Sequence, residues 1–261
     1  MVVLNKKSTL SQLKCGLIVS CQPRLNSALD HPGFVAALAT VAEEQGAVGV
    51  RIRGVHDILA VGRAVRIPII GIEKINDPKS DVYITPTIES VRRVSRAGAQ
   101  ILAMDATERP RPRGQSLTNI VAAAKDNLDA LLMADVATLK QGVEAARLGF
   151  DIVATTLHGY TEETRHCTGP AFELVRKLVQ EIKIPVILEG RVREPDHVRK
   201  AFDLGVHAVV VGTAITDFEW LARRFIDACP NAKIGSAEEQ PSRRDPQRAG
   251  FARTASRKRR S

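Results

Sequence analysis

Short runs of apolar, β-branched residues recur along the chain, and most of them end in a polar or charged residue. Uninterrupted Val, Ile and Leu is typical of strands that are covered on both faces of a parallel sheet. The pattern predicts buried strands over residues 16–22, 47–53, 68–74, 100–107, 128–135, 150–157, 184–191 and 207–216. Because a buried strand has no structural use for a charge at its end, these ends are expected to face a ligand.

Segments with the spacing of amphipathic helices separate the predicted strands. They cover residues 34–45, 55–65, 88–97, 117–127, 139–148, 172–182, 197–204 and 218–228. Several are followed by a glycine that leads into the next strand, and a glycine there provides a left-handed helix cap. A shorter segment, residues 9–14, is expected to be helical and to cover the N-terminal end of the sheet.

Strands that alternate with helices of this length form right-handed βαβ units, and eight such units fit a closed (β/α)₈ TIM barrel of the α/β class. An open, doubly wound sheet is the alternative. The first turn between strand and helix, Ser20-Cys21-Gln22-Pro23, lacks the glycine fingerprint of dinucleotide-binding sheets. We therefore predict a barrel that fills residues 1–234 as one domain.

The carboxyl ends of the strands carry the active site in such barrels. Lys74 and Glu189 are the strongest candidates, because each ends a strongly apolar run, PIIGIEK and PVILEG. Some of the other residues could instead form polar layers or, like Arg53, point outward. The full set of candidates at strand ends is Ser20, Gln22, Arg51, Arg53, Lys74, Asp105, Thr107, Asp135, Thr155, Thr156, Glu189, Arg191, Gly212 and Thr213.

The last two strand ends have the features of a phosphate site. Gly190 and Arg191 follow the seventh predicted strand, and Gly212 and Thr213 lie in the eighth. Glycines let backbone N–H groups approach an anion, and these loops often bind phosphate in TIM barrels. The chain has no GxxxxGK[ST] motif, so a small phosphate ester is favoured over a nucleoside triphosphate.

The formal net charge of +9 is concentrated near the end of the sequence. Residues 241–261 contain eight arginines and lysines and one aspartate. This stretch is poor in apolar residues, so residues 235–261 are predicted to be a disordered basic tail. A weak contact with RNA, DNA or another polyanion is the functional alternative to a merely solvated tail.

The remaining composition argues against several other classes of protein. Four cysteines and six histidines show no CxxC, HExxH or HxH spacing, so reduced thiols and no metal site are expected. No long uncharged apolar run or secretory signal is present, which predicts a cytoplasmic location.

Several of these motifs together resemble the N-acetylmannosamine-6-phosphate 2-epimerases of sialic acid catabolism. The similarity runs from about Gly16 to Phe225 and omits the basic tail. The matching stretches are GLIVSCQP, GAVGVRIRGV, IPIIGIEK, DATERPRP, LLMADV, TTLHGYT, LEGR and VVGTAIT. The sixth of them departs from the family at His158, where a small serine is expected, and the residues 162–168 that follow also differ.

The resemblance implies an isomerase that interconverts N-acetylmannosamine 6-phosphate and N-acetylglucosamine 6-phosphate without a metal or organic cofactor. Lys74 corresponds to the catalytic lysine of the family and Glu189 to its essential glutamate. Positions that contact the sugar fall on Gln22, Arg51 and Asp135. The phosphate loops fall on Gly190, Arg191, Gly212 and Thr213. A homodimer is also expected.

Two mechanisms agree with these residues. In the first, which we favour, Lys74 alone moves the C2 proton while Glu189 and Asp135 orient hydroxyls and assist ring opening. In the second, Lys74 and Glu189 act from opposite faces of the sugar. A lysine at a strand end could also form a Schiff base, as in class I aldolases, and a role of the tail in binding polyanions is the alternative without catalysis.

Overall fold

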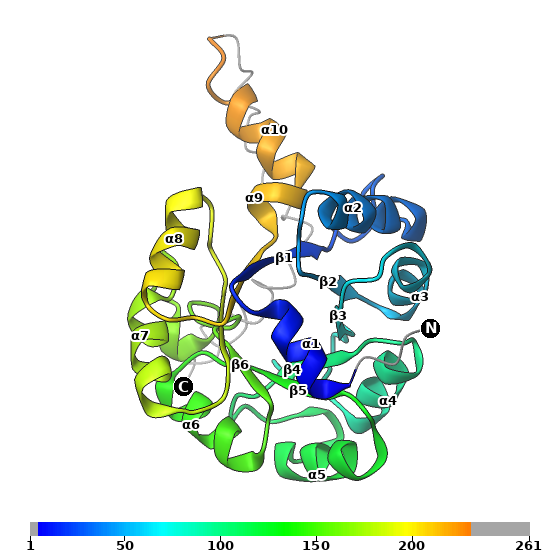
Figure 1. The fold of residues 1–261 in the computed structure, drawn as a ribbon, viewed down its shortest axis with the longest axis vertical. Helices are drawn as coiled ribbons and strands as arrows, with labels where there is room; N and C mark the ends of the chain where they lie inside the picture. The colour runs from blue at the N-terminus through cyan, green and yellow to red at the C-terminus, as the bar shows by residue number, and fades with distance from the viewer. Residues whose placement is uncertain (1–4, 231–261) are drawn as a thin grey trace, which may run out of the picture.

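The apolar runs pair in chain order and close a parallel barrel in the computed structural model, which describes residues 5–230 (Figure 1). The ring closes where β1 pairs with β8, with Gly16 opposite Ala208. The predicted TIM barrel is therefore confirmed. The strands are β1 (Gly16–Cys21), β2 (Gly49–Arg53), β3 (Ile69–Ile72), β4 (Ile101–Asp105), β5 (Leu131–Asp135), β6 (Ile152–Ala154), β7 (Val186–Glu189) and β8 (Ala208–Val211).

The described chain also forms α-helices, most of which lie in an outer layer around the strands (Figure 1). They are α1 (Lys6–Leu13), α2 (Pro32–Glu44), α3 (Val55–Ala64), α4 (Ile88–Arg96), α5 (Leu117–Asn127), α6 (Leu139–Leu148), α7 (Phe172–Glu181), α8 (Pro195–Asp203), α9 (Thr213–Thr216) and α10 (Phe218–Ile226). Local sequence fixes several of their ends. Thr138 and Gln141 form a capping box before α6, and Gly149 ends that helix in the left-handed conformation.

The core has two layers, because alternate strand residues point to opposite faces of the barrel wall. Ile18, Ile70, Met133 and Ile187 are among the buried residues that fill the interior of the barrel. A larger apolar cluster lies between the strands and the surrounding helices. The small contribution of aromatic residues, 4% of the chain, means that aliphatic packing supplies most of both layers.

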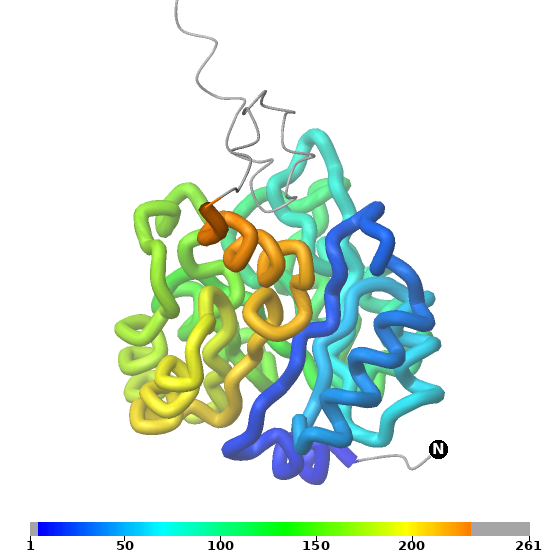
Figure 2. The backbone as a smooth tube through the Cα atoms, turned by 90° about the horizontal axis from the view of Figure 1, so that it is seen from above, coloured from blue at the N-terminus to red at the C-terminus, as the bar shows by residue number. Residues whose placement is uncertain are grey.

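Helix α1 covers the N-terminal end of the barrel, as the sequence predicted. Leu13 is fully buried and packs with the interior cluster. Nε2 of His207, which precedes β8, lies 2.8 Å from the carbonyl oxygen of Leu10. Figure 2 shows α1 at the end of the barrel opposite the loop that follows β3. The other end, where the strands have their carboxyl termini, is left accessible.

Several predicted strands are longer than the observed ones; of residues 150–157, for example, only Ile152–Ala154 is strand. Two differences change the carboxyl end of the barrel. The predicted strand 207–216 is wrong beyond Val211, because Thr213–Thr216 forms the short helix α9. The predicted strand 68–74 stops at Ile72, and the chain then makes an excursion over residues 73–87 before α4 begins. Residues 212–216 remain rich in small and β-branched side chains that also suit a strand, whereas Glu73 and Lys74 are charged and already lie outside β3.

The predicted boundary at residue 234 and the basic tail lie outside the described residues. Within residues 5–230, no helix is long and apolar enough to cross a membrane. The four cysteines all belong to this part of the chain, and each is a free thiol, as expected.

Candidate active site

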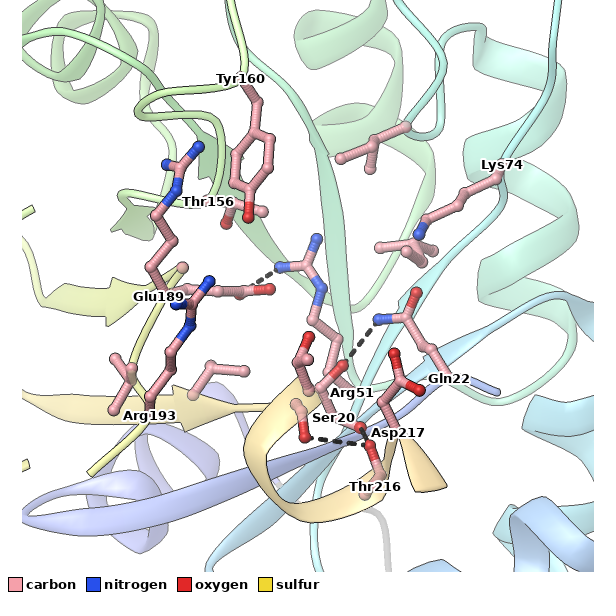
Figure 3. Close-up of a pocket in the computed structure, with 18 residues that line it drawn as sticks. Ser20, Gln22, Arg51, Lys74, Thr156, Tyr160, Glu189, Arg193, Thr216 and Asp217 are labelled. Atoms are coloured by element: carbon pink, nitrogen blue, oxygen red, sulfur yellow. Dashed lines mark hydrogen bonds and ion pairs between the residues drawn. The ribbon is translucent and has the colours of Figure 1, made fainter. Parts of the chain in front are cut away.

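A cavity of about 180 Å³ opens at the carboxyl end of the barrel. Figure 3 shows the side chains that surround it, which come from strand ends and loops around the ring. All but one of the predicted catalytic and binding residues line this cavity. The lining consists of Ser20, Gln22, Arg51, Ile72, Lys74, Ile84, Thr156, Tyr160, Glu189, Gly190, Arg191, Val192, Arg193, Val210, Gly212, Thr213, Thr216 and Asp217.

Arg51 on β2 is the central charged residue of the site, and its side chain is 1% exposed. It binds Asp135 on β5 through two hydrogen bonds, from Nη1 (3.0 Å) and Nη2 (2.6 Å). Nη1 also donates to Oε2 of Glu189 on β7 over 2.7 Å. The buried guanidinium therefore holds two carboxylates that sequence reasoning had selected separately.

This arrangement leaves one cation beside two acids. Burial lowers the pKa of Arg51, but the two carboxylates outweigh this effect and the pKa is raised overall. Burial raises the pKa of Glu189 to about 7; Arg51 opposes this rise and the charge of Asp135 adds to it. A carboxyl that titrates near neutral pH is suited to proton transfer.

Asp135 is the predicted binding residue that does not line the cavity. Its side chain is fully buried beneath the Arg51 guanidinium, and it also accepts a hydrogen bond of 2.6 Å from Thr156 Oγ1. The structure therefore places Asp135 where it fixes Arg51 and Thr156. Any ligand in the cavity would meet these two side chains first.

Lys74 lies at the end of the β3 segment and reaches into the cavity from the side opposite Glu189 (Figure 3). Its charge lowers the pKa of Glu189. Gln22 lies on the same side as Lys74, with its Nε2 donating to Ser20 Oγ over 2.9 Å. The Oε1 atom of Gln22 is buried and has no hydrogen-bond partner within the described chain. A ligand with an N–H or O–H group could satisfy it.

The two predicted phosphate loops also meet at this cavity. Gly190 and Arg191 have φ values of 109° and 57°, so the chain after β7 turns through left-handed conformations beside the cavity. Gly212 and Thr213 form the link from β8 to α9. A side chain at position 212 would crowd Ser20, whose Cβ would lie 3.1 Å from the added Cβ.

The guanidinium of Arg191 binds the loop after β6. It donates to the carbonyl oxygens of His158 (2.6 Å) and Gly159 (2.9 Å), and it lies 4.0 Å from the centre of the Tyr160 ring. His158 in turn places its Nδ1 2.9 Å from the carbonyl oxygen of Ala137. The sixth loop, which departs from the family pattern, thus supports the residue expected to bind phosphate.

Four other strand-end candidates make structural contacts instead of lining the cavity. Thr107 donates its hydroxyl to Asp105 Oδ1 over 2.7 Å. Asp105 is fully buried and pairs with Arg109 over 2.6 Å. Arg53 pairs with Asp30 on the outside of the barrel. Thr155 exchanges hydrogen bonds with the backbone of Glu189.

Sequence reasoning did not assign roles to several residues of the lining, notably Tyr160, Arg193, Thr216 and Asp217. Tyr160 belongs to the TTLHGYT stretch and Arg193 lies two residues after LEGR, so closeness to these motifs could have indicated both. Thr216 falls in the predicted strand 207–216 and Asp217 directly follows it, whereas the structure has the helix α9 at Thr213–Thr216, which brings both residues to the cavity. Among the residues that the structure describes, no group of three or more His, Cys, Asp or Glu side chains could hold a metal ion.

Comparisons with known proteins agree on one family. The family model described as "Putative N-acetylmannosamine-6-phosphate epimerase" matches residues 35–231. A protein of Clostridioides difficile named "Putative N-acetylmannosamine-6-phosphate 2-epimerase" is 42% identical over 219 residues, which cover 84% of this chain and 98% of that protein. A protein of the same name from Lactiplantibacillus plantarum is 42% identical over 226 residues, 85% of this chain and 99% of its own length.

Solved structures extend the similarity to three dimensions. The N-acetylmannosamine-6-phosphate 2-epimerase from Clostridium perfringens superposes with a TM-score of 0.83 at 39% identity, over 88% of this chain and 100% of that one. Thiamine phosphate pyrophosphorylase from Pyrococcus furiosus, at 18% identity and a TM-score of 0.53, covers 82% of this chain and 93% of its own. The second similarity reflects the shared barrel alone.

Proposed function

The chain belongs to the N-acetylmannosamine-6-phosphate epimerase family, and we propose that it interconverts N-acetylmannosamine 6-phosphate and N-acetylglucosamine 6-phosphate. The observation that carries the proposal is the placement of Lys74 opposite the Arg51-bound Glu189 in a cavity bordered by Gly190 and Gly212. Proton-transfer groups and anion-binding backbone thus border the same space.

Epimerisation at C2 of an amino sugar needs a base and a means of holding the charge that develops. In the open-chain sugar, the C2 proton passes to Lys74 Nζ and the C–H electron pair moves into the C1 carbonyl as an enolate. Reprotonation on the opposite face of C2 completes the reaction. The Arg51 guanidinium faces the cavity and can stabilise the negative oxygen.

Glu189 has the properties of a group that assists this reaction from a fixed position. Its Oε2 is held by Arg51, and a carboxyl whose pKa is about 7 can give a proton to the ring oxygen as the sugar opens and accept the proton that leaves the C1 hydroxyl. Asp135 supports it indirectly by orienting Arg51. We therefore retain Lys74 as the group that moves the C2 proton in both directions.

Deuterated water distinguishes one base from two. If Lys74 alone carries the proton, part of the original C2 hydrogen returns to the product, because the ammonium group delivers it before exchange is complete. If Glu189 delivers a proton from the other face, the product formed in the first turnover contains solvent deuterium at C2. Proton NMR of early product measures the difference.

The activity itself is tested by incubating the full chain with N-acetylmannosamine 6-phosphate and following the N-acetylglucosamine epimer by NMR, with no added metal or nucleotide. Lys74→Met should reduce kcat by a factor of at least about 10² to 10⁴, the usual contribution of a positioned base. Lys140→Met, which changes a 79% exposed side chain on α6, is the control. Near-native activity of Lys74→Met would contradict the proposal.

The alternative activity is that of a class I aldolase, in which a lysine at this position forms a Schiff base with the substrate. Borohydride treatment in the presence of the sugar phosphate or a keto acid would then trap a covalent adduct on Lys74. For the epimerase we expect no increase in mass after this treatment, and a trapped adduct would support the aldolase.

A homodimer is part of the same proposal. Helix α10 follows the eighth strand and its short helix α9, yet none of its residues is fully buried and it extends away from the barrel (Figure 1). Phe218, Phe225 and Ile226 are 65%, 76% and 51% exposed. A second copy of the chain would cover these side chains. Sedimentation of the full chain tests this, and Phe225→Asp should shift the dimer toward monomer.

We place the protein in the cytoplasm and assign the basic segment 241–261 a separate, salt-sensitive contact with polyanions. Its charge carries this part of the proposal. A chain that ends at residue 240 should lose retention on heparin at low salt while keeping its epimerase activity. Equal retention of both chains would contradict the assignment.

A further inference from the structure

The excursion after β3 holds Lys74 by contacts that the barrel strands do not provide. Strands β3 and β4 are paired directly at Ile70 and Gly71. Nearer the cavity, Ile84 lies between the two strands. It forms an antiparallel bridge with Lys74 on one side, and its carbonyl oxygen accepts a hydrogen bond of 3.0 Å from the Asp105 N–H on the other.

Thr85, the next residue, binds the backbone on the N-terminal side of Lys74 at two points. The Thr85 N–H donates to the carbonyl oxygen of Glu73 over 2.7 Å, and the Thr85 hydroxyl accepts from the Glu73 N–H over 3.2 Å. The Glu73 carbonyl belongs to the peptide bond that joins Glu73 to Lys74. Its orientation therefore fixes the direction in which the Lys74 side chain leaves the backbone.

The side chain of Glu73 is fixed as well, from outside the barrel. Arg93 on α4 donates to both of its carboxylate oxygens, over 3.0 Å and 2.7 Å. Glu73 is thus held by α4 through its side chain and by Thr85 through its backbone. Together with the bridge between Lys74 and Ile84, these contacts fix the backbone at Lys74.

The conformation of Thr85 is unfavourable for its residue type. It is fully buried and has φ of 44°, in the left-handed region that β-branched residues rarely adopt. Such a conformation is strained and persists where the surrounding structure imposes it. A glycine or asparagine would adopt it more cheaply, but neither would supply a hydroxyl in the same place.

We propose that Thr85 is a positioning residue for Lys74, whose hydroxyl bond to the Glu73 backbone keeps the ε-amino group in line with the reacting carbon. The inference rests on the proposed function, because it concerns the base of that reaction. It assigns Thr85 no contact with the substrate, since Thr85 does not belong to the residues that line the cavity. Removal of the hydroxyl should therefore change kcat more than KM.

The experiment compares Thr85→Val, Thr85→Ser and Thr85→Gly in the epimerase assay. Thr85→Val keeps the shape but leaves the Glu73 N–H without its acceptor, and we expect kcat to fall about 10- to 100-fold with KM changed less than about threefold. Thr85→Ser restores the hydroxyl and should keep kcat within about threefold. Thr85→Gly relieves the backbone strain without restoring the hydroxyl, so it should fold even if Thr85→Val does not, and should still show the lower kcat.

Thr87→Val is the matched control. Thr87 is a buried threonine in the same segment whose hydroxyl caps α4 by accepting from the Ser90 N–H. It should lower the melting temperature while leaving kcat within about twofold. Native kcat in folded Thr85→Val or Thr85→Gly, or an equal loss in Thr87→Val, would overturn the inference. An inactive wild type would instead contradict the proposed function, and an active Lys74→Met would contradict the role of Lys74.

Discussion

Arg51 and Glu189 lie 138 positions apart in the sequence and are joined by a hydrogen bond of 2.7 Å at the base of the cavity. The same guanidinium is bound by both carboxylate oxygens of Asp135. Burial disfavours the ionised form of a carboxyl, and the repulsion between the two acids adds to this effect, so one of them keeps its proton more readily than an exposed carboxyl. That acid is Glu189, whose pKa is raised to about 7.

The raised pKa makes stability depend on pH in a defined direction. Between about pH 4.5 and pH 7 the folded protein holds a proton on Glu189 that the unfolded chain releases, so the contribution of Glu189 to stability falls as pH rises through this window. Above pH 7 both states are ionised and the contribution is constant. The change is on the order of 3 kcal/mol, because a tenfold difference in proton affinity corresponds to about 1.4 kcal/mol.

Urea unfolding of Glu189→Gln at a series of pH values checks this prediction. The variant cannot ionise at this position, so its stability should decline less than that of the wild type between pH 4.5 and 7. Parallel curves for the two proteins would show that Glu189 has an ordinary pKa.

Asp135→Asn should destabilise the fold by about 3–5 kcal/mol, because it leaves the buried Arg51 without its principal counter-charge. Asp30→Asn is the comparison, since it breaks another Asp–Arg pair of 2.6 Å whose side chains are 21% and 11% exposed. Solvent compensates that second loss in part. Chemical denaturation should give a clearly smaller cost for Asp30→Asn, and equal costs would be inconsistent with a special role for burial at Arg51.

Arg193→Ala should weaken the binding of phosphorylated substrate. Arg193 lines the cavity next to the loop of Gly190, and its guanidinium lies 5.6 Å from the centre of the Trp220 ring. Loss of a cation near the phosphate should raise KM for the sugar phosphate by about 10-fold with little change in kcat. Steady-state kinetics should show no such effect for Arg199→Ala, which removes a 73% exposed arginine on α8.

Leu13→Ala should destabilise the barrel by about 2–5 kcal/mol without changing kcat, since Leu13 is fully buried at the end of the barrel opposite the active site. Leu25→Ala, at a residue that is 47% exposed, should cost far less. Thermal unfolding and initial rates, measured on the same samples, separate stability from activity. A loss of kcat in folded Leu13→Ala would mean that the two ends of the barrel are coupled.

The periodicity of apolar residues was enough to predict the barrel and most of its helices, because each unit of a (β/α)₈ fold repeats the same local requirements. It failed at Thr213–Thr216, where four residues rich in β-branched side chains form a helix and not the end of a strand. So short a helix has no periodicity of its own. Its conformation is set by contacts such as the bond from Thr216 Oγ1 to the Ser20 carbonyl, 2.7 Å long and 196 positions distant in sequence.

The residues that form the site could be predicted from the strand ends, but the contacts between their side chains could not. Sequence could indicate that Arg51, Asp135 and Glu189 point toward the same end of the barrel, but not that Asp135 lies beneath Arg51 and out of the cavity. The bonds of Arg191 to the loop after β6 were equally hidden. These details depend on side-chain directions across the ring, and no local pattern encodes them.

The position of Ile84 between Lys74 and Asp105 has a consequence for how the protein can diverge. Lys74 is held by its antiparallel pairing with Ile84 in the segment that follows it, and not by the barrel strands alone. The turn at residues 76–81 lies beyond the pairing that holds Lys74, so it can gain or lose residues without displacing the base. Homologues should therefore vary in length at this turn while the Glu73–Thr85 contact stays the same.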